Sequence, residues 1–201
     1  MTAAKFHLHL SQDPEADKLL STNSLALLIG MVLDQQVPLE WAFSAPLELS
    51  RRLGRDLDAT VIAGMDPDEL AALFTERPAL HRYPAAMARR VHELSRVLVE
   101  EYGGRAAAVW EGASSGQELL RRVRRLPGFG EQKAKIFVAL LGKQLGVQPP
   151  GWTEVSMPYG DASSYRSAAD IVDETTLRKV RAFKQELKSA AKAAKAGRSG
   201  R

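Results

Sequence analysis

Residues 119–141 read LLRRVRRLPGFGEQKAKIFVALL and contain the most specific pattern in the chain. Apolar residues at helical spacing flank the tight turn Leu126-Pro127-Gly128-Phe129-Gly130, which predicts two helices joined by a short hairpin. Two glycines one residue apart permit positive φ angles and a close approach to the backbone. The free amides of the turn and of the second helix then form an anion site, which the helix dipole strengthens.

A DNA phosphate fits this anion site without any base being read. Lys133 and Lys135, just inside the second helix, add positive charge, and Phe129 and Phe137 can pack the hairpin from beneath. The predicted DNA-binding residues of the hairpin are Gly128, Phe129, Gly130, Lys133 and Lys135. The alternative is an ordinary corner between two helices, in which the glycines serve only the bend.

The rest of the chain predicts helices and no convincing pair of strands, so the expected fold class is all-α. Residues 24–36, SLALLIGMVLDQQ, are apolar almost all round and predict a helix buried in the centre. Residues 146–166 hold three prolines and three glycines, and we expect them to be irregular. Further helices are expected near 14–20, 38–53, 58–64, 84–102, 105–111, 116–125, 131–145 and 173–187, and Asp66-Pro67-Asp68-Glu69 is expected to cap another.

Composition excludes several classes of site. The 201 residues include no cysteine, which rules out disulfides, cysteine-ligated zinc and cysteine-held iron–sulfur clusters. Of four histidines, His7 and His9 can share a face, but two ligands are too few, and we expect neither metal nor cofactor. The chain has no apolar run of about 20 residues and no secretory signal. We therefore expect a cytoplasmic, nucleoid-associated protein that does not contact membranes.

Positive charge is concentrated at the C-terminal end. Residues 178–201 hold nine basic side chains and one acid, whereas residues 1–177 have a net charge of −4. A basic arm on an acidic body favours a polyanionic partner, and a solvated tail without a partner is the alternative. We expect residues 188–201 to form a basic, disordered tail behind a domain that covers residues 1–187.

Three segments resemble the helix–hairpin–helix superfamily of base-excision DNA glycosylases, in the family's order. They are LLIGMVLDQQVP at 27–38, LHRYPAAMARRVHELSRVLVEEYGG at 80–104 and the hairpin LPGFGEQKA at 126–134. The resemblance implies an all-α, two-lobed domain that grips double-stranded DNA across a cleft. Such enzymes rotate the target base out of the helix stack before they act on it.

The resemblance also assigns roles near the expected cleft. Gln36 falls where family members place the residue that fills the gap left by the flipped base, although it can instead cap the buried helix. Asp34 can shape the base pocket or cap a neighbouring helix. Trp152 and Tyr159 can stack on the flipped base, or they can pin the irregular loop through apolar contacts.

The catalytic groups of the family match less well. Its members place an aspartate about twenty residues after the hairpin, where this chain offers Glu154 and Asp161; we favour Asp161 because its turn is tight. Either acid can instead be a helix cap. The position of the family's nucleophilic lysine holds Gln132, and we expect the adjacent Lys133 to contact phosphate.

The resemblance therefore predicts a monofunctional, monomeric DNA glycosylase without lyase activity. The first alternative is a non-catalytic DNA-binding protein of the same fold, because the aspartate and lysine are missing from their expected places. A protein-interaction module is the second alternative, and the glycine-rich hairpin with its lysines argues against it.

Overall fold

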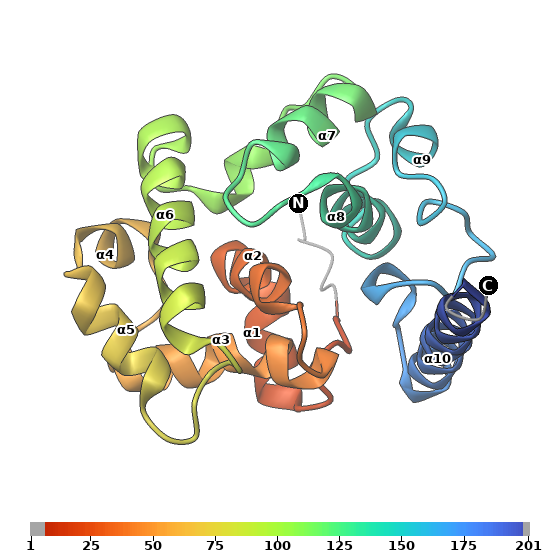
Figure 1. Ribbon diagram of the computed structural model, residues 1–201. Helices are drawn as coiled ribbons and strands as arrows, with labels where there is room; N and C mark the ends of the chain where they lie inside the picture. The colour runs from red at the N-terminus through yellow and green to blue at the C-terminus, as the bar shows by residue number, and fades with distance from the viewer. Residues whose placement is uncertain (1–6, 199–201) are drawn as a thin grey trace.

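The computed structural model describes residues 7–198, and within this range every regular element is a helix (Figure 1). The all-α prediction is confirmed. The elements are α1 (Pro14–Thr22), α2 (Ser24–Leu33), α3 (Leu39–Leu53), α4 (Ala59–Gly64), α5 (Pro67–Thr75), α6 (Pro84–Tyr102), η1 (Ala106–Val109), α7 (Gly116–Arg124), α8 (Glu131–Gln144), α9 (Trp152–Val155), η2 (Ala168–Asp170) and α10 (Glu174–Arg198).

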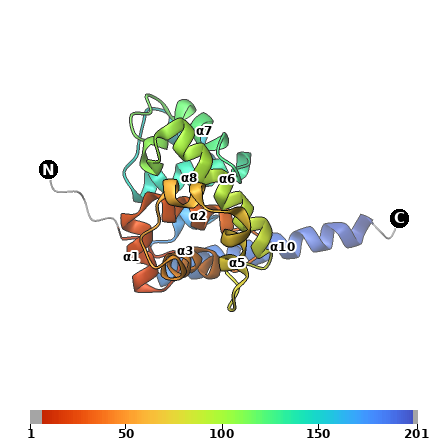
Figure 2. The same ribbon diagram turned by 90° about the vertical axis from the view of Figure 1, so that its left-hand side faces the viewer.

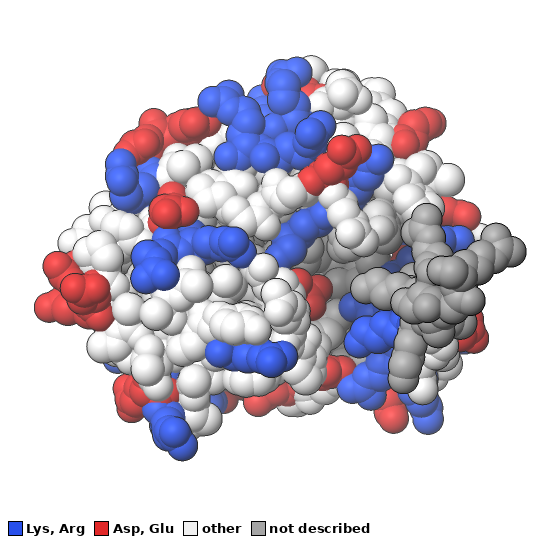
Figure 3. Space-filling view, viewed as in Figure 1, with Lys and Arg blue, Asp and Glu red and all other residues white. Residues whose placement is uncertain are grey.

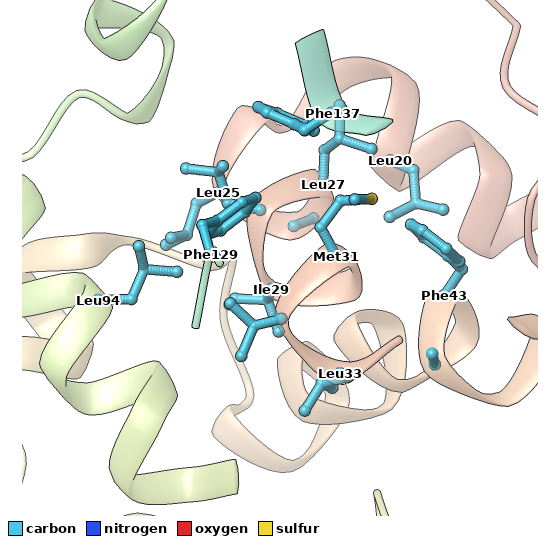
Figure 4. Packing of buried hydrophobic residues seen from close by; sticks show 14 of the residues in the cluster. Leu20, Leu25, Leu27, Ile29, Met31, Leu33, Phe43, Leu94, Phe129 and Phe137 are labelled. Atoms are coloured by element: carbon cyan, nitrogen blue, oxygen red, sulfur yellow. The ribbon is translucent and has the colours of Figure 1, made fainter. Parts of the chain in front are cut away.

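Helix α2 lies at the centre of the fold, as its apolar sequence predicts. Every residue from Leu25 to Leu33 is buried. A Cβ on Gly30 would lie 2.6 Å from the Phe43 ring, so this glycine allows α3 to pack directly on α2. Phe129 and Phe137, from the hairpin and α8, pack around the same helix (Figure 4). Each large apolar side chain buried in this way contributes about 1.5–3 kcal/mol.

Short polar caps set where these helices begin. Asn23 accepts hydrogen bonds from the amides of Leu25 and Ala26 and so starts α2. Asp66 caps α5 in the same way, ahead of Pro67 at the first helical position. Helix α2 ends at Leu33, three residues before its expected end, and the next residues turn sharply into α3. That turn lies at the candidate site.

The two expected lobes lie on either side of α2. Helices α3 to α6 pack together on one side, and α7, α8 and α9 pack together on the other (Figure 1). Within residues 7–198 no single helix is both long and apolar enough to cross a membrane. Only the bent pair of α1 and α2 meets that test, and α2 is the core of the fold.

Helix α10 differs from the sequence prediction. It runs without interruption from Glu174 to Arg198, so the boundary expected at residue 188 does not end an element. Residues 188–198 continue the helix where a disordered tail was expected; residues 199–201 of that tail lie outside the described residues. Figure 2 shows the second half of α10 projecting well away from the rest of the molecule.

Candidate functional site

The hairpin between α7 and α8 rests against the end of α2. Gly128 has a φ of +85°, and a Cβ there would lie 3.2 Å from Val32 of α2. Gly130 has an ordinary φ of −73°, and a Cβ there would meet nothing within 4 Å. Only Gly128 therefore needs glycine for its backbone conformation, whereas Gly130 leaves space open above the start of α8.

The start of α8 offers free backbone donors. Gly130 is its N-cap and provides no side-chain cap, so the amides of the first turn remain available to an anion. Phe129 is buried and packs edge-on against Phe137, with ring centroids 5.5 Å apart, so its side chain supports the hairpin from inside. Lys135 pairs with Glu131 at 3.4 Å and does not line the cleft described next.

An open cleft of about 1190 Å³ lies beside the hairpin. Its walls are the turn between α2 and α3, the first turns of α8 and the middle of α10. The surface is hollowed beside α10, and Lys and Arg side chains gather along α10 and over α7 on the same face (Figure 3). Polar and charged residues from these walls and from the segment after α9 line the cleft, among them Asp34, Gln35, Gln36, Glu40, Gln132, Lys133, Tyr159, Arg181, Lys184 and Lys188.

Asp34 is the C-cap of α2 and lies at the floor of this cleft. Burial raises the pKa of the Asp34 carboxyl above its ordinary value, because the charged form loses water. Lys184 and Lys133 oppose that rise, and Glu40 adds to it. Glu40 is itself engaged, since it pairs with Arg181 of α10. Asp34 is thus a half-buried carboxylate whose ionised form is favoured by two lysine ammonium groups.

Lys133 reaches into the cleft from α8. Its Nζ donates a hydrogen bond to the carbonyl oxygen of Val32 at 3.1 Å, and burial lowers the pKa of Lys133 to about 8. Lys133 therefore lines the cleft itself, and its contact with a DNA phosphate stays a prediction. Gln132 also lines the cleft, and its side-chain amide donates to the hydroxyl of Tyr159 at 2.9 Å.

Gln36 occupies the tip of the turn that follows α2. It is exposed, lines the cleft and has a φ of +57°, which is rare for a residue with a side chain. The neighbouring Gln35 is held instead: its amide donates to the Val32 carbonyl at 2.7 Å and accepts from Arg90 at 3.0 Å. A positive φ such as that of Gln36 is a local backbone strain, and strain of this kind often marks a functional position.

His81 holds this turn from behind. Its Nδ1 accepts the Tyr83 amide at 3.0 Å, so Nε2 carries the proton and donates to the Gln35 carbonyl at 2.9 Å. Burial lowers the pKa of the His81 ring and keeps it neutral. Nothing in the sequence near His81 or Arg90 signals these roles, because both side chains contact a turn about fifty residues away.

Comparison with known proteins identifies the family of this chain. A profile of HhH-GPD superfamily base excision DNA repair proteins matches residues 29–197, from the middle of α2 to the end of α10. The chain belongs to the HhH-GPD superfamily. No individual characterised protein and no solved structure matches the chain significantly. HhH-GPD membership assigns the protein to base excision repair and makes DNA its partner.

The two acids expected to be catalytic in this HhH-GPD protein lie outside the cleft. Asp161 is exposed; its carboxylate accepts hydrogen bonds from the amide and hydroxyl of Ser163, both at 2.8 Å, and these bonds lower its pKa. Glu154 is exposed on the short helix α9. The structure therefore brings neither carboxylate into this cleft.

Of the two aromatic residues expected in the base pocket, only Tyr159 lines the cleft. Trp152 packs on α8 instead: a Cβ on Gly142 would lie 2.3 Å from its ring. Trp152 thus anchors α9 to α8. Among residues 7–198 no group of three or more His, Cys, Asp or Glu side chains is placed to hold a metal ion.

Proposed function

We propose that this HhH-GPD protein is a monofunctional DNA glycosylase in which Asp34 supplies the catalytic carboxylate. One observation carries the proposal: a desolvated carboxylate with a raised pKa lies at the floor of the cleft beside the hairpin. The cleft-lining residues include only one other acid, Glu40, which Arg181 engages. Perturbed carboxylates in clefts are typical of catalytic sites.

Each part of the site has a place in this reaction. The open amides at the start of α8 hold a phosphate of the damaged strand, and Gln36 enters the space left by the flipped nucleotide. The bond between base and sugar then breaks, and its electron pair leaves with the base. Asp34 stabilises the positive charge on the sugar; water adds to the sugar carbon, and Asp34 takes up the water's proton.

Lys133 and Lys184 keep Asp34 ready for this role. Their positive charges favour its ionised form and oppose the rise in pKa that burial causes. The protein acts on double-stranded DNA as a monomer, and we place it at the nucleoid.

Single-turnover reactions on a panel of duplexes, each with one lesion, test this proposal. The expected product is a free base and an intact strand that breaks only after alkali. No excision of any lesion would support the non-catalytic DNA-binding alternative and contradict the proposal.

The position of Lys133 favours a second candidate, a glycosylase with lyase activity. At a pKa of about 8, roughly one-tenth of the amine is uncharged at pH 7, far more than for an ordinary lysine. An uncharged amine can attack the sugar carbon and form a Schiff base. Borohydride would trap this intermediate covalently, and a trapped complex that Lys133→Gln abolishes would replace the monofunctional proposal.

A further inference from the structure

Helix α10 is anchored to the body only over its first half. Leu177 and Val180 are buried against the rest of the molecule, and Arg181 pairs with Glu40 of α3. The preceding loop adds a stacking contact, with the Arg166 guanidinium 4.9 Å from the centre of the Phe183 ring. The helix is 25 residues long, about 37 Å, so its second half extends well beyond these contacts.

Five basic residues of α10 follow one line along the helix. Arg181, Lys184 and Lys188 line the cleft, and the sequence continues this spacing at Lys192 and Lys195. Successive steps of three or four residues keep all five positions within about 80° of the helix circumference. Glu186, the only acid after residue 177, falls outside that arc. We call these five residues the basic stripe.

The basic stripe begins inside the cleft, and the helix that carries it projects from the face of the molecule on which the cleft opens. Lys184 acts electrostatically on Asp34, so the first part of the stripe lies at the candidate catalytic site. Figure 2 shows the second half of α10 projecting to the side that faces the viewer in Figures 1 and 3, which is the face with the hollowed surface and the basic side chains over α7. Anything bound across this face must lie against the projecting helix.

We propose that the basic stripe binds the DNA backbone on one side of the lesion, so that α10 is a rigid arm beside the bound duplex. The inference rests on the proposed placement of DNA over the cleft. Successive cations of the stripe are about 4.5–6 Å apart along the helix, and duplex DNA carries one negative charge per roughly 1.7 Å of its axis. Because α10 lies on only one side of the cleft, its contacts are expected on one flank of the target nucleotide.

Binding to duplexes that contain an abasic-site analogue tests this inference without requiring catalysis. The analogue is placed near the left or the right end, so that one flank is long and the other short. We expect the parent protein to bind one of the two duplexes about tenfold more tightly. The triple variant Lys188→Ala, Lys192→Ala and Lys195→Ala should lose this preference, and its log–log salt slope should fall by up to about 0.9 per lost phosphate contact.

A matched variant separates position from charge. It combines the three alanine substitutions with Ala190→Lys, Ala193→Lys and Ala194→Lys, which moves the lysines to the opposite side of the helix at constant composition and charge. The register variant should behave like the triple alanine variant. Circular dichroism checks that both stay helical, as alanine and lysine favour helices.

Three results would overturn the inference: no flank preference in the parent, the same preference in the triple variant, or the same preference in the register variant. The last result would show that the arm acts only through its total charge and not through the positions of its lysines. Failure of the proposed catalytic function is seen separately, because a protein that excises no base can still show the flank preference on the abasic analogue.

Discussion

At the scale of single residues, Asp34 combines a cost to stability with its proposed role in catalysis. Its pKa in the folded protein is raised, chiefly by burial. A carboxyl group whose pKa is higher in the folded than in the unfolded protein contributes most to stability below its unfolded pKa. That contribution is lost as the pH rises through the folded pKa. At neutral pH the charged Asp34 therefore destabilises the fold.

Asp34→Asn should consequently raise the melting temperature at pH 7, because it removes a desolvated charge. About 1 kcal/mol corresponds to roughly 2–4 °C in a protein of this size. The gain should shrink as the pH is lowered toward 4, where the wild-type carboxyl becomes neutral. Thermal unfolding of both proteins from pH 4 to pH 8 measures this; a lower melting temperature of the variant at pH 7 would contradict a purely catalytic role.

Asp170 provides the control for that experiment. It is more deeply buried than Asp34, it pairs with Lys143, and it accepts hydrogen bonds from the amides of Arg166 and Ser167. Asp170→Asn breaks a buried ion pair and should destabilise the fold by about 3–5 kcal/mol. The two substitutions make the same chemical change and are expected to move the melting temperature in opposite directions.

At the scale of elements, the two glycines of the hairpin have different expected roles: Gly130 in DNA binding and Gly128 in folding. Gly130→Ala fits the backbone and meets nothing within 4 Å, so the protein should fold normally. Its methyl group would occupy the space above the amides of α8 and should weaken duplex binding by about tenfold, the loss of roughly one charge-assisted hydrogen bond.

Gly128→Ala should instead reduce stability by about 1–2 kcal/mol, because of its positive φ and its contact with Val32. Thermal unfolding and fluorescence-anisotropy binding distinguish the two effects. Unchanged binding by a folded Gly130→Ala protein would show that the hairpin is not the phosphate site.

The elements themselves were largely predictable from local chemistry. Caps such as Asp66 and stops such as Gly103 mark helix ends within a few residues, and the hairpin motif is contiguous. The end of the chain was misjudged because its charge density suggests a solvated tail. Alanine and lysine are both strong helix formers, and residues 188–198 continue α10.

The site was harder to predict, because it is made by contacts that are distant in sequence. Linear spacing from the hairpin favoured Asp161 and Glu154, but in the folded chain Tyr159 between them lines the cleft and the two acids do not. From the sequence alone Asp34 resembles a helix cap, because Lys133, which acts on it electrostatically in the fold, lies 99 positions later in the chain.

At the scale of the whole molecule, three parts meet at one face. The end of α2 supplies Asp34 and the exposed Gln36, α8 supplies free amides and Lys133, and α10 closes the cleft before it projects outward. The HhH-GPD match covers all three parts. The account therefore depends on one claim, that the carboxylate between these parts acts on the DNA.

Single-turnover excision with three variants and the parent on the same lesion tests that claim most directly. Asp34→Asn should lower the rate constant at least about 100-fold, while duplex binding stays equal or becomes tighter because a negative charge is removed. Asp161→Asn and Glu154→Gln should retain nearly the parent rate, since both acids lie outside the cleft. An Asp34→Asn protein that excises at the parent rate, or loss of excision in Asp161→Asn or Glu154→Gln, would contradict the account.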